Sequence, residues 1–393
     1  NIVGISTAVC LGGYGAVFWM WLIAIIGGAS AFIESTLAQI YKRRNPETGE
    51  CYGGPSYYIE AALHSRPLAV LFAITLILTY AGGFNMVASY NLQSTFSGYS
   101  FYDPATTPWV IGAILAVLVG YCLMGGGKRI MKVTSTLVPF MGGMYVLVAL
   151  IVVVLHIQLL PQVLGRIFSE AFDFQSIFAG FTGSAMMYGI KRGLFSNEAG
   201  VGSAPNAAAS AHVSHPAKQG LVQMLSVFID TLLICSATAF MLLCSGVEPT
   251  KGLEGAPYVQ AALQNVFGAA GPVFITVAMV LFAFTTLIGN LYYVDNALNY
   301  IVGRVPAREF MVLFRINAMI VIFIGAGQSI DLVWNLADVL MGLMALINLP
   351  VILILARPAL DAMKDYAAQR KAGKNPVFKA KDIGLEGKTE YWQ

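Results

Sequence analysis

The chain has 393 residues, of which 57% are hydrophobic and only 11% are charged, and its mean hydropathy is +0.71. This composition excludes an ordinary soluble domain, in which about a quarter of the residues are charged. Because apolar stretches long enough to cross a roughly 30 Å hydrocarbon core recur along most of the length, the sequence predicts an all-α polytopic membrane protein.

The beginning of the chain and its cysteines carry two smaller expectations. The first residue is Asn1 rather than Met, and no signal peptide follows, so we expect an N-terminal part of the protein to be missing. The five cysteines are scattered without paired spacing, which argues against a disulfide framework or a metal site built on thiolates.

In chain order, residues 1–12 have the character of the second half of a helix. A polar tail with eight Lys or Arg residues begins at Arg357; it contains Tyr391 and Trp392 but no apolar run, and we expect it to be solvated. Between these ends lie nine apolar segments, which make ten spans with the N-terminal remnant: about 14–40, 66–97, 108–126, 130–160, a broken region at 174–212, 217–246, 270–303, 310–329 and 331–356.

The Lys and Arg residues fall mostly in alternate connections. If Lys191 and Arg192 are counted with the richer set, 21 basic residues lie on one side and two, Arg166 and Lys251, on the other. Since cytoplasmic connections hold the excess of positive charge, the odd-numbered connections are predicted to face outward, and the C-terminus is predicted to be cytoplasmic.

The two halves of the chain match each other. Asn1–Ala8 matches Asn197–Ala204 at an offset of 196 residues, and Phe32–Ser35 matches Phe228–Thr231 at the same offset. The offset then grows in one direction, as loop insertions would produce. Tyr58–Leu63 matches Tyr258–Leu263 at 200, and Pro67, Asn85 and Asn91 match Pro272, Asn290 and Asn296 at 205.

This duplication has a geometric consequence, because each copy contains five spans. An odd number of spans forces the second copy to enter the membrane inverted, as in secondary transporters that bind substrate at the midplane between broken helices. The glycines, carboxylate and hydroxyls of Gly193–Ala204 suit such a break. We therefore predict a first five-helix repeat at 1–163, a second, inverted repeat at 164–357 and a cytoplasmic tail at 358–393.

Four stretches resemble the alanine or glycine to cation symporter family, whose members have the leucine-transporter fold. They are the Asn-x-x-Gly start, Gly12–Trp21, Gly189–Pro205 and Phe282–Gly289. The resemblance covers nearly the whole chain. It implies inverted five-plus-five repeats with broken first and sixth core helices, and Na⁺-coupled symport of small neutral amino acids.

Three positions depart from the family pattern. Members usually have Pro where Tyr14 stands, Gln where Ala88 stands and Trp where Asn290 stands. Because Ala88 and Asn290 remove bulk near the expected site, a roomier pocket admitting a larger neutral side chain such as glutamine is an alternative to alanine or glycine.

The resemblance places a zwitterionic substrate between the two breaks. A half-helix N-terminus offers free N–H groups to a carboxylate, and unwound carbonyls accept from an ammonium. We assign the substrate carboxylate to the backbone of Asn1, Ile2 and Gly4, and the ammonium to the carbonyls from Gly193 to Ser196. Asn197 is predicted to belong to the same substrate site. Phe195 is predicted as the side-chain wall, with an ordinary core aromatic as its alternative.

A Na⁺ site is predicted beside the first helix. Thr285 and Thr286, with the Phe282 backbone and carbonyls of the first helix, would give the oxygen-only shell that suits a hard monovalent cation. The alternative is that these hydroxyls bond back to their own helix.

The remaining intramembrane polar residues are assigned to binding or bracing. The amides of Asn85 and Asn290 would either bind substrate or hold helices together. Glu34 and Asp230 are repeat-related, and we favour a bracing role for each over a titrating one. Glu198 and Asp295 are expected to pair with Lys191 and Arg192, because an unpaired charge at that depth is costly, and Asp338 is left open as gate or brace.

We therefore predict a Na⁺-coupled carrier of alanine or glycine in the cell membrane, working as a monomer with no nucleic acid partner. The alternatives are a proton-coupled or uncoupled carrier on the same scaffold, with Glu34 or Asp230 titrating, and a membrane sensor or channel. An enzyme is not expected, because no set of nucleophile and base stands at a suggestive spacing.

Overall fold

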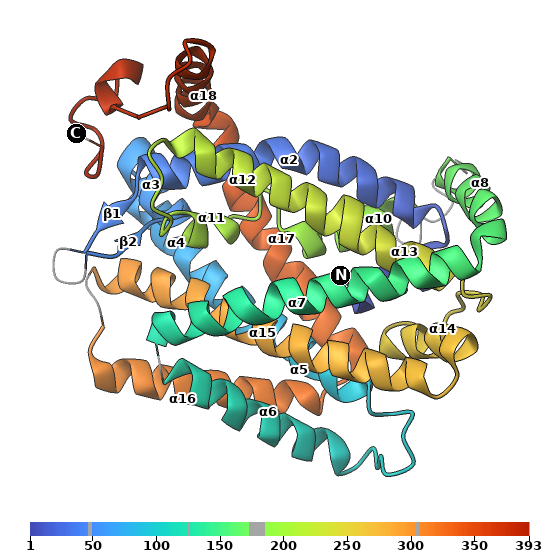
Figure 1. Ribbon diagram of the computed structural model, residues 1–393. Helices are drawn as coiled ribbons and strands as arrows, with labels where there is room; N and C mark the ends of the chain where they lie inside the picture. The colour runs from blue at the N-terminus through green and yellow to red at the C-terminus, as the bar shows by residue number, and fades with distance from the viewer. Residues whose placement is uncertain (46–48, 125, 173–184, 304–305, 393) are drawn as a thin grey trace.

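The computed structural model describes residues 1–392 except 46–48, 125, 173–184 and 304–305. The described residues form an all-helical bundle (Figure 1) whose one sheet is a short antiparallel ribbon of β1 (Arg43–Arg44) and β2 (Cys51–Tyr52). This confirms the helical fold class.

The helices before residue 160 include one span that runs through three consecutive elements, α4, η1 and α5, of which η1 is a π-helical segment. The helices are α1 (Val3–Gly12), α2 (Ala16–Ile40), α3 (Pro55–Leu63), α4 (Arg66–Ile77), η1 (Leu78–Gly83), α5 (Phe84–Ser94), α6 (Thr107–Leu123), α7 (Gly126–Leu155) and η2 (Ile157–Leu159).

In the second part, α12, η4 and α13 likewise form one span with a π-helical middle. The helices are α8 (Leu160–Ala171), α10 (Ala185–Asn197), α11 (Ala204–Ala208), α12 (Pro216–Phe228), η4 (Ile229–Cys235), α13 (Ser236–Leu243), α14 (Ala256–Phe267), α15 (Ala270–Val302), α16 (Arg308–Ala326), α17 (Ile330–Ile354), α18 (Ala356–Lys371) and η5 (Ala380–Ile383).

Seven helices within the described part of the chain are long and apolar enough to cross a membrane, and α1 and α6 are shorter apolar helices. The polytopic prediction is therefore confirmed, while part of the predicted broken region, residues 173–184, lies outside the description. The seven spans are Ala16–Ile40, Arg66–Ser94, Ser135–Leu155, Pro216–Leu243, Ala270–Val302, Arg308–Ala326 and Ile330–Ile354.

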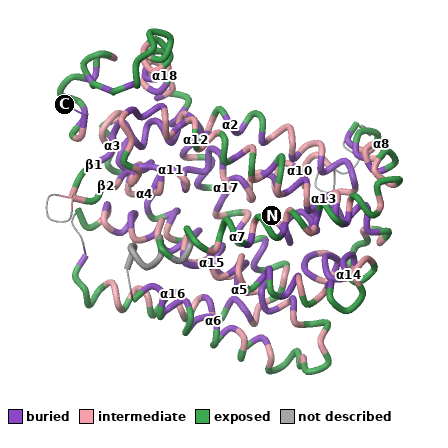
Figure 2. The backbone as a smooth tube through the Cα atoms, in the orientation of Figure 1, coloured by how far each residue is buried: buried purple, intermediate pink, exposed green. Residues whose placement is uncertain are grey.

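The outer surface of the bundle is apolar along its length. Large apolar side chains point outward from α6, α7 and α17, with Val117, Val154 and Leu346 exposed by 65%, 67% and 73%. Figure 2 shows exposed residues along α6 and α16 and buried ones along the inner helices. An apolar belt of this extent suits lipid contact rather than water.

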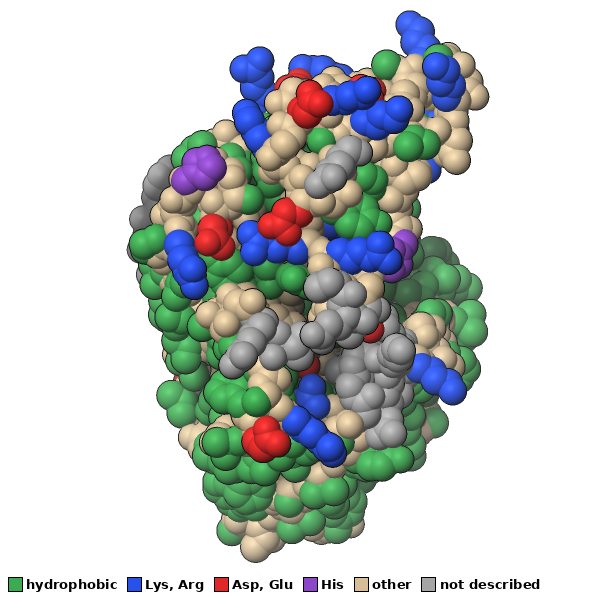
Figure 3. Space-filling model, turned by 90° about the vertical axis from the view of Figure 1, so that its left-hand side faces the viewer, with side chains coloured by type: hydrophobic (Ala, Val, Ile, Leu, Met, Phe, Trp, Pro, Cys, Tyr) green, Lys and Arg blue, Asp and Glu red, His purple; other side chains and the backbone are tan. Residues whose placement is uncertain are grey.

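The two ends of the bundle differ. β1, β2, α3 and the C-terminus lie at one end, and α8 and α14 lie at the other (Figure 1). Figure 3 looks at the first end and shows many Lys and Arg side chains over it. Arg166 belongs to α8, and Lys251 lies just before α14, so both stand at the opposite end.

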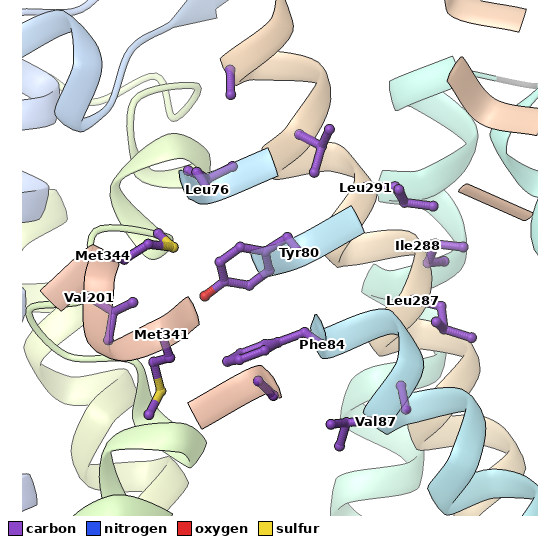
Figure 4. Packing of buried hydrophobic residues seen from close by; sticks show 14 of the residues in the cluster. Leu76, Tyr80, Phe84, Val87, Val201, Leu287, Ile288, Leu291, Met341 and Met344 are labelled. Atoms are coloured by element: carbon purple, nitrogen blue, oxygen red, sulfur yellow. The ribbon is translucent and has the colours of Figure 1, made fainter. Parts of the chain in front are cut away.

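The interior between α15 and α17 is filled by the span that contains η1. Tyr80 and Phe84 point toward Met341, while Ile288 lies on the other side of the helix that carries them (Figure 4), and all four are buried. This packing fixes the helix that carries Phe84 and the residues after it, which face the cavity described below.

A close contact joins α2 and α10. Gly189 and Gly193 are spaced as a Gly-x-x-x-Gly pair, and the contact allows no side chain at either. A Cβ on Gly189 would lie 2.3 Å from the carbonyl oxygen of Ala16, and one on Gly193 would lie 2.6 Å from Ile23. Small residues let helix backbones approach in this way.

The C-terminal tail is docked, so the expectation of a solvated tail is wrong. Trp392 is buried, and its Nε1 donates to the carbonyl of Gln39 at 2.7 Å. Lys42 is fully buried, with its Nζ 4.1 Å from the ring centre of Tyr391. Phe378 packs between Trp392 and His215. A few aromatic residues anchor the tail without any apolar run, because each buries a large area.

Candidate functional site

A cavity of about 300 Å³ lies between the N-terminus of α1, the C-terminus of α10, and helices α5, α15 and α17. One side of it is polar and the other is apolar and aromatic. Its lining consists of Asn1, Ile2, Val3, Gly4, Phe84, Val87, Ala88, Asn91, Phe195, Ser196, Glu198, Asp230, Met279, Phe282, Ala283, Thr286 and Trp334.

The start of α1 faces this cavity. α1 begins at Val3, and Asn1 to Gly4 all line the space. The structure thus brings Asn1, Ile2 and Gly4, the residues predicted to hold the substrate carboxylate, to the wall of the cavity.

The predicted break follows α10 and occupies the second half of the stretch from Gly193 to Ala204. α10 remains helical through Asn197, and the carbonyl of Leu194 accepts the N–H of Glu198 at 2.9 Å. The unwound segment runs from Glu198 to Ser203, with positive φ at Glu198, Gly200 and Gly202. The unwound segment therefore lies inside the predicted stretch Gly193–Ala204. The carbonyls of Gly193 to Ser196, which were expected to be unwound, are helical instead, because Gly193 packs against α2 within α10.

Asn197 and Glu34 hold the break in place. The Asn197 side chain accepts from the N–H of Ala199 and donates to Thr231, both at 3.0 Å. Glu34 is fully buried, and its Oε1 accepts from the N–H of Gly200 at 3.2 Å. Its other oxygen accepts from Nδ2 of Asn348 at 2.9 Å. Glu34 thus contacts the unwound backbone directly, which is the geometry of a brace.

Asp230 stands at the cavity wall. Its Oδ2 accepts from the Ser196 hydroxyl at 2.6 Å, and Ser196 also contacts Oδ1 of Asn1. These side chains come from η4, α10 and the start of the chain. Three oxygen-bearing side chains at one spot give this side of the cavity negative potential, which attracts a cationic group such as an ammonium.

The aromatic wall is formed by Phe195, Phe84 and Trp334. The ring centres of Phe195 and Phe84 are 4.5 Å apart, and those of Phe195 and Trp334 are 4.8 Å apart. All three rings line the cavity. Phe195 was predicted from the sequence, whereas Trp334 carried no signal that separated it from other span residues.

Lys191 and Arg192 pair with Asp338 of α17. The guanidinium of Arg192 donates to both carboxylate oxygens of Asp338 at 2.9 Å, and Nζ of Lys191 lies 2.8 Å from Oδ2. Arg192 is buried and stacks on the Trp334 ring at 4.2 Å. Charges held beside the cavity do not belong to a surface connection, so counting them with the basic side was wrong.

The predicted partners of these two cations were also wrong. Asp295 pairs with Arg315 at 3.1 Å, and Glu198 accepts a hydrogen bond from the Ser203 hydroxyl. Asp338 is the partner of both cations instead, because α17 packs beside α10. The spacing of residues along the sequence does not reveal that these two helices are close. The other 19 of the 21 residues, after removing Lys191 and Arg192, still outnumber the two on the opposite side.

The two threonines of α15 behave differently. The Thr285 hydroxyl donates to its own helix, to the carbonyl of Leu281 at 3.0 Å or that of Phe282 at 3.1 Å. Thr286 lines the cavity, as the start of α1 does. Of the two hydroxyls, the geometry therefore leaves that of Thr286 to meet a ligand. Thr285 is bonded within its own helix, which was the alternative to a role in the Na⁺ site.

Four predicted substrate residues lie outside the cavity lining: Asn85, Asn290, Gly193 and Asn197, of which Asn197 instead holds the break in place. Asn85 and Asn290 are buried and bonded to each other, with Nδ2 of Asn290 donating to Oδ1 of Asn85 at 3.0 Å. Gly193 faces α2. Conversely, the structure adds Asn91 to the cavity lining and Asn348 to the groups that hold the break through Glu34 and Gly200. An amide within an apolar span is a sequence signal that could have found both.

The sequence is similar to those of known transport proteins. A sequence model described as the sodium:alanine symporter family matches residues 1–380. The sodium/alanine symporter AgcS of Methanococcus maripaludis is 38% identical over 380 residues, covering 94% of this chain and 81% of that protein. The sodium/proton-dependent alanine carrier protein of Bacillus sp. is 36% identical over 408 residues, covering 100% and 90%. The probable sodium/glutamine symporter GlnT of Bacillus subtilis is 42% identical over 392 residues, covering 100% and 80%.

Proposed function

We propose that this chain, which belongs to the sodium:alanine symporter family, carries alanine or another small neutral amino acid together with Na⁺ across the cell membrane. The observation that carries the proposal is the cavity between the start of α1 and the end of α10, polar on one side and aromatic on the other. A zwitterion with a small apolar side chain matches both sides at once.

The substrate carboxylate would meet the N–H groups at the start of α1, from Asn1 to Gly4. The ammonium would meet the oxygens of Ser196 and Asp230 and the last carbonyls of α10. Phe195 and Trp334 would cover the side chain. Each charged group of the substrate then faces the opposite partial charge, which compensates the loss of its hydration.

Na⁺ would bind at the Thr286 hydroxyl, with the Phe282 backbone and oxygens of the first helix. An all-oxygen shell is what a hard cation requires. Because the start of α1 would contact both ion and substrate, binding of one would favour the arrangement that binds the other, which is the requirement for coupling.

The scaffold would be two inverted five-helix repeats, meeting at a pseudo-two-fold axis, with residues 1–163 and 164–357 as the copies. Two features support this. The matched residues Asn85 and Asn290 contact each other, as residues on a two-fold axis must. The matched helices α3 and α14 each follow a glycine with positive φ, Gly54 and Gly255.

The end that holds β1, β2 and the docked tail would face the cytoplasm, because it carries most of the basic residues. Asp338 lies in the first part of α17, nearer the opposite end. Its pairing with Arg192 and Lys191 would then close the cavity on the outer side during alternating access. One protein chain contains every residue proposed for this site.

Uptake of labelled alanine into proteoliposomes tests the proposal. We expect accumulation that requires an inward Na⁺ gradient, and uptake that ignores the gradient would overturn the coupling. Thr286→Val should raise the Na⁺ concentration for half-maximal uptake by about tenfold, the equivalent of about 1.4 kcal/mol. Thr285→Val is the matched control with a smaller effect, because that hydroxyl is bonded within its own helix.

Proton coupling is a second candidate, favoured by one observation: two carboxylates, Glu34 and Asp230, contact the elements around the cavity from repeat-related positions. This candidate predicts uptake driven by a pH gradient in the absence of Na⁺. Asp230→Asn would abolish that component if Asp230 carries the proton.

A further inference from the structure

The cavity extends well beyond the groups that would hold the backbone of an amino acid. Phe84, Val87, Ala88 and Asn91 line it at the spacing of one helix face. Seven residues of helix rise about 10 Å, so the space follows α5 for that length. Its 300 Å³ has room for about ten water molecules at roughly 30 Å³ each. Alanine would leave much of this space unfilled.

The far end of this space contains an unsatisfied acceptor. Oδ1 of Asn91 is buried and has no hydrogen-bond partner among the described residues, and the side chain as a whole is 7% exposed. Such an atom pays a desolvation cost of about 1–3 kcal/mol unless a donor reaches it. Val87 and Ala88 on the same helix and Met279 of α15, which line the same cavity, are apolar and offer no donor.

Asn91 also borders a second space. It lines a second pocket of about 130 Å³ with Tyr90, Gln93, Tyr102 and Glu254. That pocket is built from the end of α5 and the starts of α14 and α17. A substrate whose head lies between α1 and α10 would therefore point its side chain along α5 toward Asn91.

We propose that the site takes a neutral amino acid with a side-chain carboxamide, of the length of glutamine, and that Asn91 determines this specificity. The amide would donate to Oδ1 of Asn91. Because a carboxamide both donates and accepts, it pairs with the Asn91 side chain in either of its two orientations. Ala88 leaves the room that the longer side chain needs.

Other side chains of similar length fit less well. A carboxylate side chain would have no donor in the apolar part and would share the cavity with Glu198 and Asp230. A cationic side chain would exchange its hydration shell for one neutral acceptor, which is poor compensation. A thioether such as methionine fills the space but leaves Asn91 unpaired. Because glutamine and methionine are similar in length, comparing their binding separates the effect of the side-chain amide from the effect of side-chain size.

The inference rests on the proposed function and is tested on the full chain in proteoliposomes. Na⁺-dependent uptake of labelled alanine is competed by glutamine and by methionine, and the ratio of their inhibition constants is measured. We expect glutamine to compete about tenfold better than methionine, as one buried hydrogen bond provides. Asn91→Leu, which keeps a similar volume, should abolish or invert the ratio. Asn317→Leu, which removes an exposed amide on α16, should leave the ratio unchanged.

Filling the space provides a second variant. Ala88→Leu should weaken competition by glutamine and by methionine alike, relative to alanine. The inference is overturned if alanine uptake is Na⁺-driven but glutamine competes no better than methionine, or if Asn91→Leu leaves the ratio intact. Absence of Na⁺-driven alanine uptake and of glutamine uptake in the unmodified protein would instead overturn the proposed function.

Discussion

Asn290 donates its Nδ2 to Oδ1 of Asn85 at 3.0 Å, and the two residues occupy matching positions of the internal sequence repeat. Both are buried, and neither lines the cavity. Of the two roles left open for these amides, the contact favours holding the α5 and α15 helices together.

Removal of either amide should destabilise the protein without changing substrate recognition. Asn85→Leu or Asn290→Leu leaves a buried polar group unpaired, at a cost of about 1–3 kcal/mol. The double variant should recover part of the loss, because no orphaned amide then remains. Thermal unfolding in detergent measures both effects. A rise in the KM for alanine at unchanged stability would show instead that these amides contact the substrate.

Gly189→Ala should destabilise the contact between α2 and α10. The added Cβ would lie 2.3 Å from the carbonyl oxygen of Ala16, so the helices must separate, and overpacking of this kind costs about 1–3 kcal/mol. Gly142→Ala in α7 is the matched control, because a Cβ there meets nothing within 4 Å. Its melting temperature should be unchanged or slightly higher, since alanine favours the helix.

Glu34→Gln should be disruptive even though it conserves shape. Both carboxylate oxygens accept, one from Gly200 and one from Asn348, and a glutamine would turn an amino group toward one of these donors. Asn348 cannot reverse its amide freely, because its Oδ1 accepts from Tyr58 and its Nδ2 also donates to the carbonyl of Gly200. We expect a loss of about 1–3 kcal/mol, measured by thermal unfolding, with reduced transport. Unchanged stability would contradict the bracing role.

Asp338→Asn should affect the protein strongly, because Arg192 would remain buried without a counter-charge. Breaking a buried pair by removing one partner costs about 3–5 kcal/mol. Asp361→Asn is the control, since its partners Arg357 and Lys364 are exposed and surface pairs contribute about 0–1 kcal/mol. The melting temperatures of the two variants compare them directly; equal shifts would contradict the importance of the inner pair.

Docking of the tail should weaken in acid. Nε2 of His215 lies 3.1 Å from Oδ2 of Asp365, and burial lowers the pKa of His215 more than Asp365 raises it. The docked form therefore holds the imidazole neutral and binds fewer protons than the undocked form. Its stability is fully present above the ordinary histidine pKa of about 6.5 and is lost as the pH falls through the lowered pKa.

Tryptophan fluorescence reports this change. The difference in acrylamide quenching between the protein and Trp392→Phe gives the accessibility of Trp392, which we expect to rise between about pH 7 and pH 5. His215→Asn should remove most of that rise. An equal rise in the variant would show that another group controls the docking.

The positions of the helices could be predicted from the sequence, because apolar length and turn chemistry act locally. The unwound stretch after α10 could be predicted in this way, from glycines and hydroxyls in an apolar region, but the residue at which it starts could not. Helix propensity does not reveal that Gly193 packs against Met20 and Ile23 and so must remain helical.

The sequence by itself determined a polytopic helical protein with two matching halves, a break before Ala204 and a phenylalanine at the site. Only the tertiary structure decided which groups meet: Arg192 with Asp338, Asn85 with Asn290, Thr286 rather than Thr285 toward the cavity, and Trp392 against the end of α2. The physical reason is that the burial of a residue depends mainly on its own hydrophobicity and on its periodic position along the helix, and both can be read from the sequence. Ion pairs and hydrogen bonds between helices depend instead on the approach of segments far apart in the chain, which packing alone fixes.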